Sequence, residues 1–239
     1  MRKLLFLLLL IPVFGIGQVK NVLTASRYFP KADKVLDFEK ALAAHAQKYH
    51  TGDFKWRVFE IQSGPDAGGY MVSEGPTNWD ALDGRGNLGN DHNTDWNKSV
   101  AIYTTERGGS AYASFVDSLS TVQLTDYSDK IIINHIYPKP GMINGVIDLQ
   151  KKLKQVWIAG KESVAVYQSV NSGSPEFLNV TRLKNGLKEL ADGYRKPLPD
   201  RFNAVNGAGT WDNYLADYSK YVENRWSELL FYRADLSSK

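Results

Sequence analysis

The sequence contains no cysteine. This absence excludes disulfide bonds and thiolate metal sites, and it excludes a lipid anchor, which needs a cysteine at the cleavage site. A Gly-rich phosphate loop, a nucleophile elbow and a catalytic Ser/His/Asp order are missing as well. We therefore expect a chain that is held together by its hydrophobic core alone and carries no recognisable hydrolase or nucleotide-binding motif.

Strong charge of one sign is also lacking. The formal net charge is +3, and it includes Arg2 and Lys3, so that the chain without its first 17 residues carries +1. The sequence holds no Lys/Arg-rich cluster of the kind that nucleic-acid binding requires. We expect no nucleic-acid partner.

Long hydrophobic runs are absent after the first residues, and those residues predict an export signal. A positive start is followed by an apolar run over 4–14, about half of the roughly 20 residues that a membrane span needs. Gly15 and Gly17 are small residues at the spacing that signal peptidase prefers, which places cleavage before Gln18. The mature protein is then periplasmic or secreted and not inserted in a membrane; an uncleaved anchor is the alternative.

The chain repeats a set of motifs. The repeated motifs are Arg-Tyr-Phe-Pro-Lys at 27–31 and His-Ile-Tyr-Pro-Lys at 135–139, Asp-Gly at 83–84 and 192–193, and Asp-Ser-Leu-Ser at 117–120 with Asp-Leu-Ser at 235–237. The offset between matched positions grows from 108 at the prolines to 117 at the end, so that insertions fall in loops. We predict a signal peptide at 1–17, one repeat at 18–120, a linker at 121–129 and a second repeat at 130–239.

Each half predicts the element order β-α-β-β-α-β. In the first half we expect strands at 21–29, 54–62, 70–74 and 110–119, a helix at 35–49 capped by Asp33, a short helix around 79–82 and a helix at 94–107. In the second half we expect strands at 130–137, 162–170, 176–181 and 226–234, helices at 144–158, 183–194 and 210–224, and a long loop at 195–209.

This order resembles the dimeric α+β barrel superfamily, which includes antibiotic-biosynthesis monooxygenases, haem-degrading monooxygenases, stress-responsive barrel proteins and NIPSNAP-type proteins. The resemblance covers nearly all of the mature chain. It implies an α+β fold in which two tandem ferredoxin-like units close one pseudo-symmetric barrel within a single chain, with pockets between each sheet and its own helices. Whether this barrel forms a further homodimer stays open.

The resemblance also raises haem chemistry, because some haem-degrading members place a functional Asn on the first strand and a Trp and an axial His on later helices. Asn134 occupies a position similar to that of the functional Asn, on the first strand of the second half. However, the chain has no histidine after His135, so that the axial His is missing there. In the first half Trp79 and His92 are suitably placed, yet the aligned strand carries Ser26-Arg27. Neither half holds the full set, so we expect no haem and no other cofactor.

Arg27 and His135 occupy the same position in the two repeats and are the main candidate ligand-binding residues. Histidine titrates near neutral pH and serves as a base or an anion ligand, whereas arginine binds a carboxylate or phosphate as a fork. The alternative is that both cover a strand end and pair with nearby carboxylates. Asn134 and Trp79 complete the candidate set.

The remaining histidines predict no metal site. His45 lies on the apolar stripe of its helix and is expected in the core, and His50, five residues later, falls on a different helix face. His92 lies in a polar loop with Asp91 and Asp95, without the spacing of compact metal sites.

Two functions remain open for this sequence. The first is a cofactor-free barrel that binds a small apolar or anionic ligand, or a protein partner. The second is a cofactor-independent enzyme of the antibiotic-biosynthesis monooxygenase type, because an electron-rich substrate can itself react with oxygen. We expect the distinction to rest on whether Arg27 or His135 opens into an apolar cavity.

Overall fold

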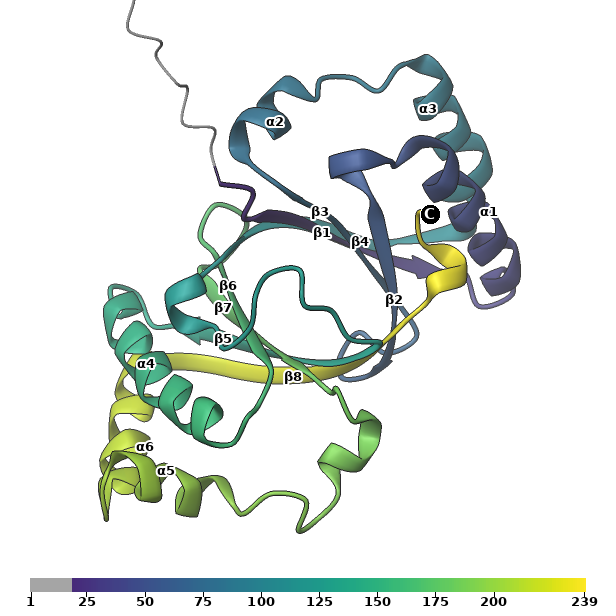
Figure 1. The fold of residues 1–239 in the computed structure, drawn as a ribbon. Coiled ribbons are helices and arrows are strands. Elements are labelled where there is room, and N and C mark those ends of the chain that lie inside the picture. Colours follow the sequence, from purple (N-terminus) through teal and green to yellow (C-terminus); the bar gives the residue numbers. More distant parts are fainter. Residues whose placement is uncertain (1–18) are drawn as a thin grey trace, which may run out of the picture.

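The structure, a computed structural model, describes residues 19–239, and in this range the chain forms an eight-stranded closed barrel with helices on its outer face (Figure 1). The predicted signal peptide at 1–17 and its cleavage position before Gln18 lie outside the described residues. Over residues 19–239 no helix is both long and apolar enough to cross a membrane.

The elements of the first half run from β1 to β4. Their bounds are β1 Val22–Pro30, α1 Val35–Tyr49, β2 Trp56–Ser63, β3 Tyr70–Thr77, α2 Trp79–Gly84, α3 Asn90–Asp95 and β4 Thr104–Phe115. The second half runs from β5 to β8. Its elements are β5 Lys130–Pro138, α4 Ile143–Ala159, β6 Val164–Ser169, β7 Glu176–Arg182, α5 Leu198–Asn206, α6 Thr210–Tyr221 and β8 Val222–Tyr232.

The strands close the barrel in the order β1-β3-β2-β8-β5-β7-β6-β4, and all neighbours are antiparallel. The first four strands meet the last four at two seams, β2–β8 and β4–β6. The β4–β6 seam is short, with Ser114 opposite Gln168 and Phe115 opposite Tyr167. The expected closed barrel is confirmed, whereas the tandem duplication stays a prediction.

Along the covered parts of the strands, side chains alternate between the barrel interior and the helix layer, whereas β4 is exposed over most of its first nine residues. On β2, Arg57 and Phe59 face the interior cavity, whereas Trp56 and Val58 pack in the helix layer. A strand that is covered on both sides needs apolar residues at most positions. This explains why strands such as β5 read as nearly continuous apolar runs.

Amphipathic helices cover the two outer faces of the barrel (Figure 1). In α1 the buried stripe includes Phe38, Leu42 and His45, as its spacing predicts, and α4 likewise buries Leu149 and Leu153. The predicted cap of α1 is wrong. Lys34, not Asp33, occupies the N-cap position, and no side chain caps this helix.

Three predicted elements differ most from the structure, and the strand expected at 110–119 is β4, which ends at Phe115 before a 3-10 turn at Asp117–Leu119. The helix expected at 94–107 ends early, since β4 begins at Thr104. The helix expected at 183–194 is only a short 3-10 segment, because Gly186 and Gly193 adopt left-handed backbone angles. The loop expected at 195–209 contains α5, whose second residue is Pro199; proline is tolerated in the first turn, where its missing N–H costs no helical hydrogen bond.

Each half ends in a short segment that binds the other half. The Val166 N–H of β6 donates to the Ser120 hydroxyl, and the Val58 N–H of β2 donates to the Ser237 hydroxyl, each at 2.9 Å. These serines belong to the repeated Asp-(Ser)-Leu-Ser motif. We name residues 116–121 and 233–238 the end segments; they reinforce the β4–β6 and β2–β8 seams.

Candidate functional site

The inward side chains line a partly open cavity of about 310 Å³ inside the barrel. Its wall is mainly apolar, and its apolar lining residues are Leu23, Ala25, Phe59, Met71, Ala111, Ala113, Ile131, Ile133, Leu178 and Val180. An apolar cavity with a few polar groups at its ends is the usual form of a small-molecule site.

Arg27 and His135, predicted at the same position of the two repeats, line this cavity and contact one carboxylate, that of Glu228. Arg27 donates to both oxygens of Glu228, at 2.9 Å and 2.5 Å, and to Asp66 at 2.8 Å. His135 Nε2 lies 3.0 Å from Glu228, and its Nδ1 lies 3.1 Å from Glu176. The alternative interpretation, in which both residues pair with nearby carboxylates, is thus what the contacts show.

The surroundings favour a protonated His135. Burial works against its charge, but hydrogen bonds to Glu176 and Glu228 outweigh burial and raise its pKa. Burial alone would raise the pKa of Glu228, whereas Arg27 and His135 lower it. The His135 ring also stacks on Trp226, with ring centroids 3.6 Å apart. At this end of the cavity the charged groups of Arg27, His135, Glu176 and Glu228 are therefore paired with one another, and we call them the ionic chain.

The opposite end of the cavity carries a different cation. The Arg57 guanidinium carbon lies 3.2 Å from the centre of the Tyr127 ring, and no carboxylate among residues 19–239 forms an ion pair with Arg57. Arg182, by contrast, donates to the carbonyls of Gln123 and Leu124. The Arg57 guanidinium thus has no ion-pair partner among the described residues.

The other two candidates lie outside the barrel interior. Asn134 points into the layer between the second sheet and its helices, where its side-chain oxygen accepts from Arg225 at 2.9 Å. Trp79 on α2 is partly exposed and packs against Tyr112, with ring centroids 5.6 Å apart. Neither residue joins Arg27 and His135.

A second cavity of about 390 Å³ lies between the outer face of the first sheet and helices α1 to α3. Its wall contains His45, His50 and His92. His45 is buried, as predicted, but the argument that separated it from His50 is wrong: their Nε2 atoms lie 3.4 Å apart. The helix ends at Tyr49, and His50 leaves the helical path with φ −109° and ψ 89°.

Burial also sets the charge of this cluster. It lowers the pKa of His45 in spite of Asp95, and it lowers the pKa of His50 in spite of Glu74. Both rings are therefore neutral near pH 7, and a neutral imidazole presents one N–H and one lone pair.

The sequence matches no protein-family model and no curated protein. The fold is similar to solved structures of an anthrone oxidase-like protein (TM-score 0.59, 11% identity, 90% of this chain and 92% of that chain) and of a candidate monooxygenase from Fusobacterium nucleatum subsp. nucleatum (0.54, 11%, 88% and 91%). It is also similar to a haem-binding protein from Thermus thermophilus (0.50, 9%, 90% and 92%). The chain has a ferredoxin-like barrel fold. At these identities the likeness shows the fold alone.

Proposed function

We propose that this protein binds one small amphipathic molecule inside its barrel, with the apolar body in the cavity and an anionic group on Arg57. The observation that carries the proposal is an apolar cavity of about 310 Å³ that ends on an arginine without an acidic partner among the described residues. A guanidinium binds a carboxylate through two parallel hydrogen bonds.

The opposite, ionic end limits the ligand. Because Glu228 and Glu176 are engaged by Arg27 and His135, that end offers little free positive charge to a second anion. A ligand with one charged end and an apolar tail therefore suits the cavity better than a doubly charged one. Medium-chain carboxylates belong to this class.

Calorimetric titration with decanoate tests this proposal, with decanol as the uncharged probe. We expect decanoate to bind one site and Arg57→Gln to weaken it at least tenfold, because the fork is lost. Lys151→Gln removes one charge from an exposed position and serves as the matched control. Equal affinity of wild type and Arg57→Gln, or no binding at all, contradicts the proposal.

Oxygenase activity is a second candidate function. Its support is the likeness of the fold to monooxygenase-type proteins, together with the outer cavity between the first sheet and α1 to α3. With anthrone as the substrate, one atom of O₂ enters the ring carbon as a carbonyl and the other leaves as water with the two hydrogens of that carbon. An oxygen electrode measures this reaction, and consumption no faster than in buffer argues against it.

We also propose that the protein works outside the cytoplasm, as its first 17 residues suggest, and that its barrel arose by duplication. The strand orders β4-β1-β3-β2 and β8-β5-β7-β6 and the matching Ser120 and Ser237 contacts support the duplication. Cleavage before Gln18 is tested by N-terminal sequencing of protein secreted by its host.

A further inference from the structure

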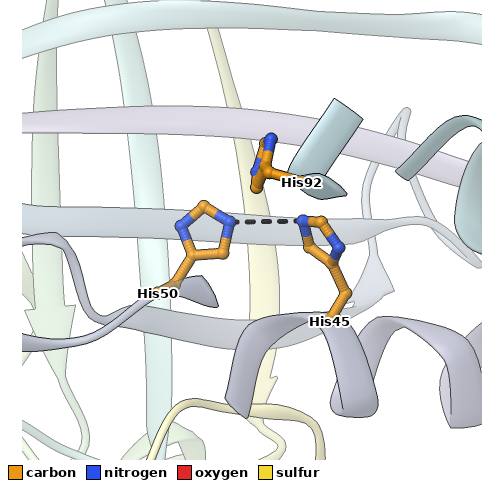
Figure 2. A group of neighbouring side chains, drawn as sticks. All are labelled: His45, His50 and His92. Carbon is orange, nitrogen blue, oxygen red and sulfur yellow. Dashed lines mark hydrogen bonds between the residues drawn. The ribbon is translucent and has the colours of Figure 1, made fainter. Parts of the chain in front are cut away.

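Three of the four histidines in the sequence meet in the outer cavity of the first half. Figure 2 shows their rings turned toward one another: His45 comes from α1, His50 follows the end of α1, and His92 comes from α3. One ring nitrogen from each lies within 4.8 Å of the others. Helix α1 and the separate segment that carries α3 are thus joined at one point.

The spacing of the nitrogens matches a metal centre. His45 Nε2 and His50 Nε2 are 3.4 Å apart. Two imidazole nitrogens that bind one zinc ion tetrahedrally, at about 2.0–2.1 Å each, stand about 3.3 Å apart. An ion fits between these atoms with little movement of either ring.

Carboxylates orient two of the rings from behind. His45 Nδ1 lies 2.7 Å from Asp95, and His50 Nδ1 lies 3.0 Å from Glu74. Since an ionised carboxylate only accepts hydrogen bonds, each Nδ1 carries the proton, and each Nε2 lone pair is directed into the cluster. Two facing lone pairs at 3.4 Å repel unless a cation lies between them.

His92 supplies a third free nitrogen. Its Nδ1 is 3.1 Å from the side-chain oxygen of Asn93, which leaves the lone pair on Nε2. This Nε2 is buried and has no hydrogen-bond partner among the described residues. A buried acceptor without a partner is costly, and a bound cation would satisfy it.

The structure around the cluster is rigid on one side and open on the other. Glu74 is held by the Trp56 indole N–H at 2.7 Å and by Arg85 at 2.9 Å, and the Trp56 ring stacks on His50. The remaining cavity wall carries small polar side chains together with aromatic ones, among them Ser26, Ser110, Tyr28, Trp96 and Tyr112. Three protein ligands beside an open cavity are typical of catalytic rather than structural metal sites.

We propose that His45, His50 and His92 bind one divalent transition-metal ion through their Nε2 atoms, with an open position toward the outer cavity. Neutral imidazoles suit zinc, copper, nickel and iron, whereas calcium and magnesium prefer oxygen ligands. This site is separate from the barrel cavity and does not depend on the ligand proposed there. It replaces the sequence prediction of no metal with a testable assignment.

The test is zinc binding to the mature, tag-free protein after treatment with a chelator. Calorimetry is expected to give one Zn²⁺ per chain, and Co²⁺ is expected to give the strong visible absorption of a tetrahedral site. His92→Gln keeps the size of a polar side chain at the least buried position of the three and is expected to weaken Zn²⁺ binding at least a hundredfold. Asp95→Asn is expected to weaken it about tenfold, since it removes an orienting carboxylate.

His135→Gln is the matched control, because it removes the remaining histidine and leaves the cluster intact. It is expected to bind Zn²⁺ like the wild type. Circular dichroism confirms that each variant is folded, and Zn²⁺ is expected to raise the melting temperature of the wild type and of His135→Gln but not of His92→Gln. Binding of less than one Zn²⁺ per wild-type chain, or equal affinity of His92→Gln and wild type, overturns the assignment. Decanoate binding would be unaffected by either result.

Discussion

The layers between the two sheets and their helices have the same architecture and opposite chemistry. In the first half this layer holds three imidazoles beside an open cavity. In the second half the matching position of α4, 111 residues after His45, is Val156, which packs in an apolar cluster with Trp157 and Phe202. Both layers hold a cavity, of about 390 Å³ in the first and about 380 Å³ in the second, so they differ in the side chains that line it. Three imidazoles line the first cavity, whereas aromatic and aliphatic side chains with Arg201 and Arg225 line the second.

Two amides of the second layer satisfy one another, whereas the buried Tyr218 hydroxyl of the same layer has no hydrogen-bond partner among the described residues. Gln150 and Asn179 exchange two hydrogen bonds of 3.0 Å in the buried interior. In the first layer the Nε2 of His92 has no such partner among the described residues. Paired polar groups specify a packing arrangement, whereas an unpaired buried group leaves a position for something else to bind.

The largest expected effect is a loss of stability after a substitution in the second layer, which should leave zinc binding in the first layer unchanged. Phe202→Ala removes a fully buried ring that contacts Trp211 and Tyr214, and it is expected to lower the free energy of unfolding by about 3–5 kcal/mol. Urea denaturation measures this loss. Zinc affinity is expected to stay within about twofold of the wild type, and a large loss of zinc binding would show that the layers are not independent.

The ionic chain inside the barrel lies between both layers and gives the next effect. Glu228→Gln removes the charge that holds Arg27 and His135, at a side chain with 0% exposure. Breaking a buried pair by removing one partner costs about 3–5 kcal/mol. The loss is measured by urea denaturation at pH 7, with the exposed Glu223→Gln as the control. A change below about 1 kcal/mol would mean that the chain contributes little to stability.

A smaller effect tests the amide pair of the second layer. Gln150→Leu leaves the Asn179 amide unsatisfied and is expected to cost about 1–3 kcal/mol. Adding Asn179→Leu is expected to recover most of this loss, since no polar group is then left without a partner. Thermal unfolding of the single and double variants measures both steps. If Asn179→Leu does not restore the melting temperature, the loss in Gln150→Leu does not come from the unsatisfied Asn179 amide.

The smallest expected effect is a pH dependence of stability from His135. Its pKa is raised in the folded state above the ordinary value of 6.5, so its contribution is fully present below about pH 6.5 and is lost as pH rises through the folded pKa. The pKa of Glu228 is lowered below its ordinary 4.5, so its contribution is lost in acid. His135→Gln is expected to flatten the decline on the alkaline side only, as urea midpoints between about pH 6 and 9 would report.

The sequence predicted the strands and the main helices because their periodicity follows from burial on two faces. It failed at 183–194 and 195–209, where the positions of Gly186, Gly193 and Pro199 decide the backbone and the apolar pattern is weak. It singled out Arg27 and His135 as candidates from their repeated position, and their role in binding a ligand stays a prediction. It missed Glu228, which lies 201 residues from Arg27 and is brought to it only when the barrel closes.

The histidine cluster was missed for a local reason. Helical geometry places residues five apart on different faces, and this argument holds only while the helix continues. Here α1 ends at Tyr49, and His50 turns back toward His45. The helix predicted from the sequence already ended at Tyr49. The helical periodicity therefore did not apply to His50, which lies beyond that end.

The end segments have a consequence for how the protein could be divided. Ser120 binds the second half, Ser237 binds the first, and the two seams involve no covalent bond, so that residues 121–129 are the sole covalent tether between the halves. Such a tether acts by raising the effective concentration of one half near the other, in the millimolar range for short linkers. A chain that is cut once within residues 121–129 would therefore stay assembled only at protein concentrations above the dissociation constant of its two halves.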